Sequence, residues 1–418
     1  MYESEPFPYK NEPFYLPVSI SFGNTNIKPI ECMNKTRKFF VLLFFMALIQ
    51  VGRINAQPLK KVVNDAFDFA EQQSLIMAKK YEKQPGILPR SFENGKDISS
   101  DSRWWCSGFF PGSLWYLFEH SQNQDILKYA KMYTDRVERE KYTTDNHDVG
   151  FMLYCSFGNG LRITGEERYK EVLLTGAKSL ATRFDPNVGL IRSWDHNTEV
   201  WQYPVIIDNL MNLELMLWAA DYSKDERFRR IAISHADKTM QHHFRPDYSS
   251  YHVVSYDRKT GIPHKKQTHQ GAADDSAWSR GQAWGLYGYT YLYRETKDKR
   301  YLTQAMHIAD FLINHPHMPK DFIPYWDFDA PQIPNTPRDA SAAALMASAL
   351  TELSDFVDAK SKKKYMQVVE TQIRTLASKK YTSKLGENGA FILKHSTGAY
   401  PLKSEVDVPL TYADYYYL

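Results

Sequence analysis

Two aspartates stand where apolar segments begin, and together they could work as an acid and a base. Asp148 belongs to the segment DNHDVGF at residues 145–151, and Asp208 belongs to IIDNLMNL at residues 206–213. A carboxyl group among apolar neighbours is partly desolvated, which raises its pKa toward that of a working general acid. A helix N-cap explains either residue alone, because Asp is favoured directly before an apolar helical segment. For the pair, a catalytic role is favoured if the two segments start helices that face each other.

The segment SAWSRGQAWGLYG at residues 276–288 has the composition of a sugar-binding site. Its tryptophans, Trp278 and Trp284, offer flat faces on which the C–H side of a pyranose ring stacks. Arg280 and the glutamine two residues later supply fixed donors for hydroxyl and carboxylate groups. An amphipathic helix with tryptophans in the core has the same spacing, so buried packing stays open as the alternative.

A recurring amphipathic pattern predicts the helices that must position these residues. Five segments each place a large apolar residue at one position and a smaller one four residues later, with polar residues between them. They cover residues 125–137, 167–181, 226–240, 299–312 and 363–376. More uniformly apolar helical segments alternate with them, at residues 111–120, 147–162, 206–222, 276–294 and 340–357. A further helix is expected at residues 59–81.

This alternation predicts an all-α fold, an (α/α)6 barrel with an outer ring of amphipathic helices and an inner ring of apolar ones. The uneven spacing of the segments argues against a solenoid with a strict period. Residues 185–203 and 247–270 are expected to be loops long enough to build a mouth. The ends of the inner helices would then carry the chemistry. Nothing within residues 57–418 looks like a linker, so we expect one domain there.

The first 56 residues are expected to be separate from this domain. Basic residues follow Met33, then come an apolar run at residues 39–51 and the sequence INA before Gln57, which is the pattern of a secretory signal peptide at residues 33–56. The apolar run is short for a membrane anchor. Residues 1–32 are interpreted as a non-native upstream extension. We therefore expect an exported protein, periplasmic or extracellular, that begins near Gln57 and has no membrane anchor.

Net charge, cysteine content and histidine spacing bear on nucleic-acid binding, a disulfide and a metal site. Without residues 1–56 the formal net charge falls from +3 to about +1, which provides no broad field for nucleic acid. Cys106 and Cys155 could pair in an oxidising compartment, although two buried thiols are equally compatible with the sequence. Histidines and aspartates are frequent at residues 242–275 but lack the spacing of a zinc site, so we expect no metal and no organic cofactor.

Four motifs that follow one another along the chain are together typical of a known enzyme family. They are HDxGF at residues 147–151, IIDNxMNL at 206–213, THQGAADDSxWxRGQAW at 268–284 and DxSA at 339–342. With these motifs, residues 57–418 resemble the unsaturated glucuronyl hydrolases of glycoside hydrolase family 88. The unsaturated rhamnogalacturonyl hydrolases, which act on pectin fragments, share the barrel but are less similar in the longer motifs. Relatives usually continue beyond residues 414–418, so we expect the last inner helix to be truncated.

The resemblance implies an unusual glycosidase that acts on oligosaccharides released by polysaccharide lyases, of the glycosaminoglycan type. Such an enzyme hydrates the C4=C5 double bond of the non-reducing unsaturated uronate. Asp208 matches the family's general acid and base, and Asp148 matches its second aspartate, which holds sugar hydroxyls and raises the pKa of Asp208. Substrate-binding roles are implied for eight further residues: His147, His252, Gln270, Trp278, Arg280, Trp284, Trp105 and Trp194. Of these, Trp105 and Trp194 are expected to be stacking walls.

Two other classes of protein remain open from the residues alone. A binding module would capture sugars in an aromatic cleft without cleaving them. A toroidal polysaccharide lyase would create the double bond with tyrosine and histidine as acid and base, and 28 tyrosines leave that chemistry available. The motifs disfavour both.

Overall fold

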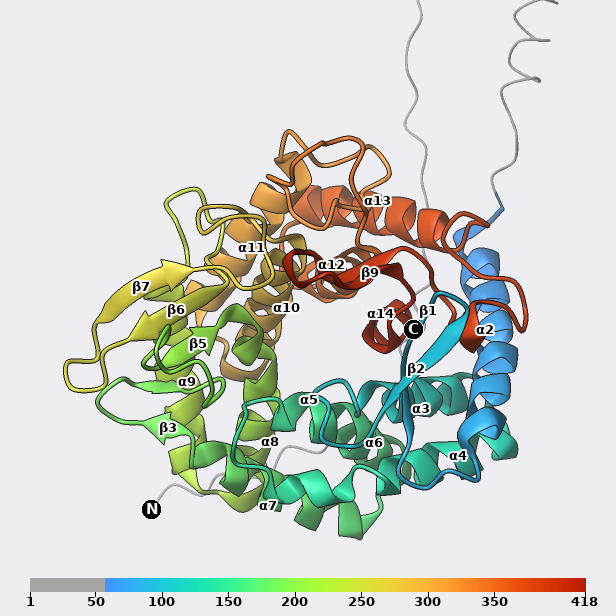
Figure 1. The fold of residues 1–418 in the computed structure, drawn as a ribbon, viewed down its shortest axis with the longest axis horizontal. Coiled ribbons are helices and arrows are strands. Elements are labelled where there is room, and N and C mark those ends of the chain that lie inside the picture. Colours follow the sequence, from blue (N-terminus) through green and yellow to red (C-terminus); the bar gives the residue numbers. More distant parts are fainter. Residues whose placement is uncertain (1–56) are drawn as a thin grey trace, which may run out of the picture. The chain divides into compact units, whose positions relative to one another are not determined.

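Within residues 57–418, helices alternate between an inner and an outer ring (Figure 1), and each ring has six members when α5 and α6 are taken as one. The inner ring consists of α3 (Phe109–Ser121), α5 (Val149–Leu153) continued through the π-helical turn η2 (Tyr154–Gly158) into α6 (Asn159–Thr164), α8 (Leu213–Ser223) with the preceding 3-10 helix η3 (Ile207–Asn212), α10 (Ser279–Thr296), α12 (Ala340–Leu353) and α14 (Thr411–Tyr417). The outer ring consists of α2 (Leu59–Tyr81), α4 (Gln124–Asp135), α7 (Glu167–Ala181), α9 (Glu226–His242), α11 (Lys299–Asn314) and α13 (Ala359–Leu376). The predicted (α/α)6 barrel is confirmed.

The structure is a computed structural model, and it describes residues 57–418. Residues 58–418 form one compact unit. The predicted upstream extension at residues 1–32 and the predicted export signal at residues 33–56 lie outside the described residues. Among the described helices, none combines the length and the apolar character needed to cross a membrane.

Burial explains which helices form which ring. In α10, residues 279–286 are buried without interruption, so this helix is covered on all sides. In α4 the buried residues are Ile126, Tyr129, Ala130, Tyr133 and Thr134, which make one helical stripe at intervals of three and four residues. Apolar and amphipathic patterns in the sequence therefore correspond to inner and outer helices.

The C-terminal and N-terminal helices complete the two rings. Helix α14 packs against α3 and α12, and α2 packs against α4 and α13. The hydroxyl oxygens of Tyr116 in α3 and Tyr415 in α14 are 3.0 Å apart and share a hydrogen bond. Tyr415 also packs edge-on against its neighbour Tyr416. Aromatic side chains thus fill the contact between the last helix and the first inner helix.

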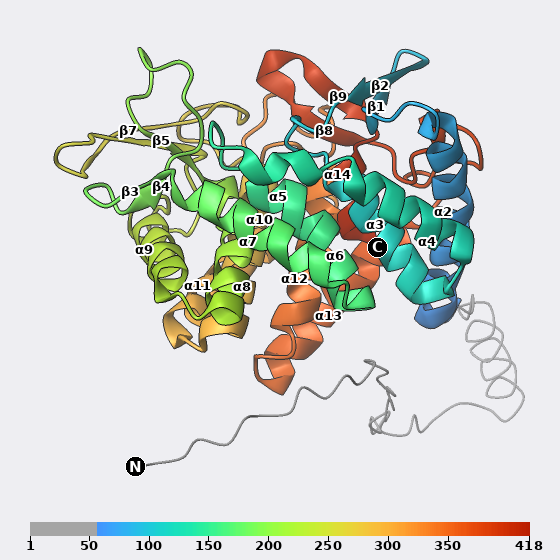
Figure 2. The same ribbon diagram turned by 90° about the horizontal axis from the view of Figure 1, so that it is seen from below.

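Short antiparallel strands lie at one end of the barrel (Figure 2). They form a hairpin of β1 (Leu88–Glu93) and β2 (Lys96–Ser100), a pair of β3 (Phe184–Asp185) and β4 (Leu190–Ile191), a sheet of β5 (Pro204–Ile206), β6 (Val253–Tyr256) and β7 (Pro263–Gln267), and a pair of β8 (Ser396–Ala399) and β9 (Ser404–Val408). Residues 185–203 and 247–270, expected to be loops, therefore contain strands. The β-branched residues Val205 and Val254 are directly opposite each other, and both are fully buried.

Candidate active site

Asp148 and Asp208 both lie where inner-ring segments begin, and neither carboxylate caps a helix. Asp148 occupies the N-cap position of α5, but its side chain makes no capping hydrogen bond. Asp208 is the second residue of η3, whose N-cap is Ile206. Capping therefore explains neither residue, and both carboxylates are available for chemistry.

Gly150 and Asn212 bring the two carboxylates together by joining α5 to η3. The backbone N–H of Phe151 donates a 2.9 Å hydrogen bond to Oδ1 of Asn212. A Cβ atom on Gly150 would lie 2.6 Å from the Cα atom of Asn212, a distance that side chains do not tolerate. The glycine of the HDxGF motif and the second asparagine of the IIDNxMNL motif are thus required for the close approach of the two segments.

Burial makes both carboxyl groups weak acids. Asp208 is 7% exposed, and burial raises its pKa from 3.8 to about 7, although the charge of Arg280 and the indole of Trp284 lower it. Burial also raises the pKa of Asp148 to about 8, with a further increase from the charge of Asp208. The guanidinium of Arg183 lowers the pKa of Asp148. The sequence predicted a raised pKa for Asp208, with repulsion from Asp148 as one cause; in the structure burial is the first cause for both groups, and the repulsion belongs to the pair.

His252 faces Asp208 with a defined tautomer. Its Nδ1 atom accepts hydrogen bonds of 3.1 Å from the backbone N–H groups of His269 and Gln270. Because Nδ1 is an acceptor, the neutral ring carries its proton on Nε2. That nitrogen lies 3.8 Å from Oδ2 of Asp208, and neither atom has a hydrogen-bond partner among residues 57–418. Burial lowers the pKa of His252, which keeps the ring neutral.

His147 contacts Asp148, and the backbone of Gln270 contacts His252. Nε2 of His147 is 3.5 Å from Oδ1 of Asp148, and burial lowers the pKa of the ring to about 3. A neutral His147 cannot form an ion pair with Asp148, so it orients the carboxyl group by polarity alone. The Gln270 amide donates to the backbone oxygen of Gly398, at the β8 edge of the mouth.

Arg280 belongs to an internal network. Its guanidinium is 1% exposed and donates to Oδ2 of Asp339 at 2.9 Å and to the backbone oxygens of Thr397 and Gly398 at 2.5 and 2.6 Å. Only Nε lacks a partner among the described residues. Arg280 therefore connects α10 to the start of α12 and to β8 through hydrogen bonds, and in this structure its role is structural. Its direct contact with substrate stays a prediction.

The four tryptophans differ in how much surface they offer. Trp284 is fully buried and packs against Phe151 and Tyr416, and its role in substrate binding stays a prediction. Trp278 is 3% exposed and packs against His252 at 4.6 Å. Both are buried because α10 packs against the outer helix α11 and against the inner-ring elements α12 and η3.

The predicted stacking walls, Trp105 and Trp194, are each partly exposed. Trp105 packs against Tyr412 of α14 at 4.9 Å, so part of its ring belongs to the core. Trp194 packs edge-on against Trp201 and keeps part of its ring at a cavity. Trp194 therefore keeps an aromatic surface that a ligand can reach.

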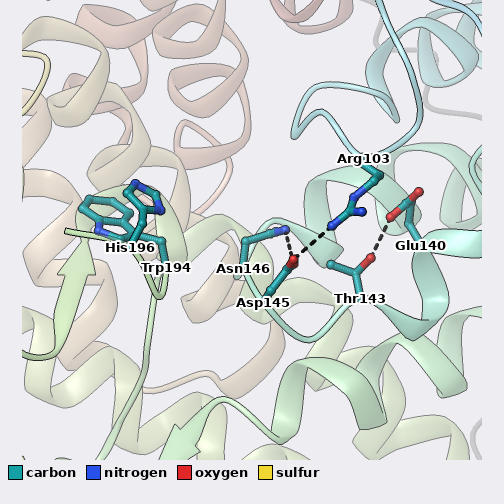
Figure 3. A pocket seen from close by; sticks show the side chains of 7 residues that line it. All are labelled: Arg103, Glu140, Thr143, Asp145, Asn146, Trp194 and His196. Atoms are coloured by element: carbon teal, nitrogen blue, oxygen red, sulfur yellow. Dashed lines mark hydrogen bonds and ion pairs between the residues drawn. The ribbon is translucent and has the colours of Figure 1, made fainter. Parts of the chain in front are cut away.

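That cavity is about 280 Å³ and lies beside the His147–Asp148 segment (Figure 3). Seven residues line it: Arg103, Glu140, Thr143, Asp145, Asn146, Trp194 and His196. Arg103 pairs with Asp145 at 3.2 Å, and Thr143 donates to the buried carboxylate of Glu140. An aromatic face with several charged and polar groups around it is the lining that a sugar ring requires.

The sequence matches Glycosyl Hydrolase Family 88 over residues 80–418. The chain belongs to this family. A curated unsaturated glucuronyl hydrolase of Formosa agariphila is 45% identical over 334 residues, which cover 79% of this chain and 83% of the relative. An unsaturated chondroitin disaccharide hydrolase of Streptococcus pneumoniae is 31% identical over 86% of this chain and 91% of its own length.

Solved structures agree with this family 88 assignment. A crystal structure of an unsaturated glucuronyl hydrolase specific for heparin has a TM-score of 0.83 and 49% sequence identity, and the match covers 85% of this chain and 95% of that one. The unsaturated glucuronyl hydrolase of Bacillus sp. GL1 has a TM-score of 0.78 at 28% identity, over 84% of this chain and 94% of that one. The predicted family and enzyme class, an unsaturated glucuronyl hydrolase, are confirmed.

Several residues that support the family 88 site were not predicted as site residues. Arg183 influences Asp148, yet it is held by Asp195 twelve positions later, and no local pattern marks it. Asp339 had a signal in the DxSA motif: it caps α12 by accepting from the N–H and hydroxyl of Ser341, and it pairs with Arg280. The position of Asp339 directly before an apolar helical segment, where an N-cap is expected, was the signal that could have identified it.

The acidic, histidine and cysteine side chains of this family 88 chain form neither a metal cluster nor a disulfide within residues 57–418. Within residues 57–418, no group of three His, Cys, Asp or Glu side chains is placed to hold a metal ion. Asp274, one of the acidic residues near the histidine-rich segment, accepts from the backbone N–H of Thr268. Cys106 and Cys155 are free thiols rather than a disulfide.

Proposed function

We propose that this family 88 enzyme removes a 4,5-unsaturated uronic acid from the non-reducing end of lyase-generated glycosaminoglycan fragments. The observation that carries the proposal is the buried Asp208, whose raised pKa of about 7 lets it hold a proton near neutral pH. Its buried Oδ2 atom has no hydrogen-bond partner among residues 57–418, so no protein group competes for the proton there. Relatives that act on unsaturated glucuronyl and chondroitin disaccharides support the same substrate class.

The proposed reaction begins with proton transfer from Asp208 to C4 of the unsaturated uronate. Positive charge then develops at C5 and the ring oxygen, and water adds at C5 while the Asp208 carboxylate takes a proton from it. The hemiketal opens to a keto acid and releases the next sugar. One carboxyl group gives a proton and recovers one, so no external base is needed. The rule that relates carboxylate separation to stereochemistry in ordinary glycosidases does not apply.

Asp148 and His252 have supporting roles in this proposal. Asp148 holds sugar hydroxyls and couples its titration to that of Asp208, so the pair carries one proton over a range of pH. The Nε2–H of His252 faces the Asp208 carboxyl and stabilises its charged form after proton transfer. Trp194 and the cavity beside it are proposed to receive the leaving sugar.

Export from the cell is a further part of the proposal. The motivating observation is the basic and apolar pattern of residues 33–56. N-terminal sequencing of the protein secreted by its own host should find a mature chain that begins near Gln57. Recovery of the uncleaved chain from the cytoplasm would overturn this part.

The test follows the ultraviolet absorbance of the conjugated uronate in lyase-generated chondroitin, hyaluronan, heparin and rhamnogalacturonan disaccharides. We expect absorbance to fall with release of the partner sugar, fastest for a glycosaminoglycan disaccharide. A preference for the rhamnogalacturonan disaccharide would make the protein a pectin-fragment hydrolase. A rise in absorbance on intact polymer would identify a lyase, and unchanged absorbance with bound sugar would identify a binding module.

A further inference from the structure

Helix α9 carries a stripe of buried polar side chains on one face. His235, Thr239 and His243 follow each other at intervals of four residues, and His243 is the C-cap of the helix. All three are fully buried. Helix α9 packs against β4 and η3, the element that carries Asp208. We name these three residues the α9 polar stripe.

The polar atoms of this stripe are almost entirely without protein partners. His235 accepts a 3.0 Å hydrogen bond at Nδ1 from the backbone N–H of Ile191, but its Nε2 has no partner. The hydroxyl of Thr239 and both ring nitrogens of His243 also have none among residues 57–418. Threonine in a helix commonly donates to the carbonyl four residues earlier, and Thr239 does not.

Unpartnered polar atoms also occur on the active-site side of the same region. Asn209, next to Asp208, donates to the backbone oxygen of Ile191 at 2.9 Å, while its Oδ1 atom has no partner. Ile191 thus joins Asn209 to His235 through its two backbone polar groups. Nδ1 of His147 also lacks a partner with hydrogen-bond geometry, although the Asn209 side chain is close enough to raise the pKa of this ring as a hydrogen-bonding neighbour. Two sets of buried polar atoms therefore flank one connection between α9 and η3.

The histidines in this region are neutral and influence one another. Burial lowers the pKa of His243, with a further decrease from His235, and the pKa of His235 is decreased by His147. Burial lowers the pKa of His252, with smaller decreases from His269, Arg280, His243 and His147. A neutral ring has one donor and one acceptor nitrogen, so each ring can take part in a directed hydrogen-bond chain.

We propose that internal water molecules connect the α9 polar stripe to η3, and that this hydrated layer positions His147 and His252 against Asp148 and Asp208. Buried polar groups are paired with protein or with ordered water, and here the protein supplies too few partners. His235, Thr239 and His243 are positioning residues in this proposal, since none touches the catalytic carboxylates. The catalytic consequence rests on the proposed function, whereas the hydration does not.

The experiment compares Thr239→Val and His243→Phe with a matched control. Thr290→Val is that control, because Thr290 is also buried in a helix but its hydroxyl already donates to Leu286. High-resolution crystal structures of the mature protein and the variants report ordered water. Nitrogen-15 spectra of the histidine rings report tautomers. Steady-state kinetics on a lyase-generated disaccharide separates kcat from KM.

We expect ordered water beside Thr239 and His243 in the unchanged protein and its loss in both variants. We expect His243→Phe to lower kcat about tenfold with KM little changed, as loss of a group that orients catalytic side chains does. His243→Gln, which restores a donor and an acceptor, should recover most of kcat, and Thr290→Val should leave it unchanged. A dry interface, or variants with unaltered histidine tautomers and unaltered kcat, would overturn the proposal. Ordered water in a protein that turns over no unsaturated uronate would contradict the proposed function alone.

Discussion

The Nε2 atom of His252 lies 3.8 Å from the Oδ2 atom of Asp208, and both atoms are buried without another partner among residues 57–418. The separation is too long for a hydrogen bond between them. It leaves an N–H donor and a protonatable oxygen pointing at the same small region. A reacting group there could receive a proton from Asp208 while His252 stabilises the carboxylate that remains.

Asp208→Asn should lower kcat by about a thousandfold, because an amide cannot donate and recover the proton. Binding of the unsaturated disaccharide should persist, since the side chain keeps its shape. The absorbance assay and calorimetric titration with the substrate measure the two effects. Asp414→Asn is the control: Asp414 is also buried with a pKa of about 7, but it accepts from Ile392 and Leu393 away from the site. Equal loss of kcat in both variants would show that the effect is only structural.

Activity should fall as pH rises above neutrality. The acid step requires protonated Asp208, and the coupled pair loses its shared proton around the pKa values of about 7 and about 8. The alkaline limb of the kcat profile should therefore lie in this range rather than near 4. Asp148→Asn removes the charge of one partner and should move this limb. A limb that is identical in the variant would mean that Asp148 is not coupled to Asp208.

Asp208→Asn should also stabilise the protein at alkaline pH. The folded state raises the pKa of Asp208 above its ordinary 3.8, so the folded protein binds this proton more tightly than the unfolded chain does. The free energy of unfolding of the unchanged protein thus falls as pH rises from about 4 to about 7. The amide variant has no such proton to lose. Its free energy of unfolding, compared with that of the unchanged protein, should therefore be more favourable at pH 8 than at pH 4 by on the order of 2–4 kcal/mol. Urea unfolding at both pH values measures the difference, and parallel curves would contradict it.

Asp339→Ala should be strongly destabilising because it leaves the Arg280 charge buried and unpaired. The two side chains are 0% and 1% exposed, and breaking a buried pair costs about 3–5 kcal/mol. Asp355→Ala is the matched control, since Asp355 pairs with Lys362 on the surface and should change the free energy of unfolding by less than about 1 kcal/mol. Similar decreases in the free energy of unfolding from both substitutions would show that the buried Arg280–Asp339 pair matters no more to stability than a surface pair.

Gly150→Ala should separate the two carboxylates. The added methyl group would overlap Asn212, so η3 must shift and carry Asp208 with it. A displacement of about 1 Å at a catalytic group can lower kcat about a hundredfold. Gly86→Ala is the control, because a Cβ there meets no atom within 4 Å and should leave kcat unchanged. An active Gly150→Ala variant would mean that the α5–η3 contact can loosen without cost.

The sequence predicted an acid–base pair, which stays a prediction, and it predicted the helices through local patterns. Asp148 and Asp208 stand out because each begins an apolar segment, and the 59–81 helix has the predicted bounds because its pattern is uninterrupted. Short strands such as β3 and β4 were missed because two residues carry too little periodicity to predict a strand. Their pairing depends on contacts with neighbouring segments.

The sequence alone determined the residue types of the site, the apolar and amphipathic character of the helices and the order of the motifs, since each is a property of neighbouring residues. Only the tertiary structure decided that Trp284 is core while Trp194 borders a cavity, and that Arg280 is held by Asp339 and β8. It also decided that two ordinary carboxyl groups become weak acids. Burial and the distance between charges are set by segments that are far apart in sequence, and no local pattern records them.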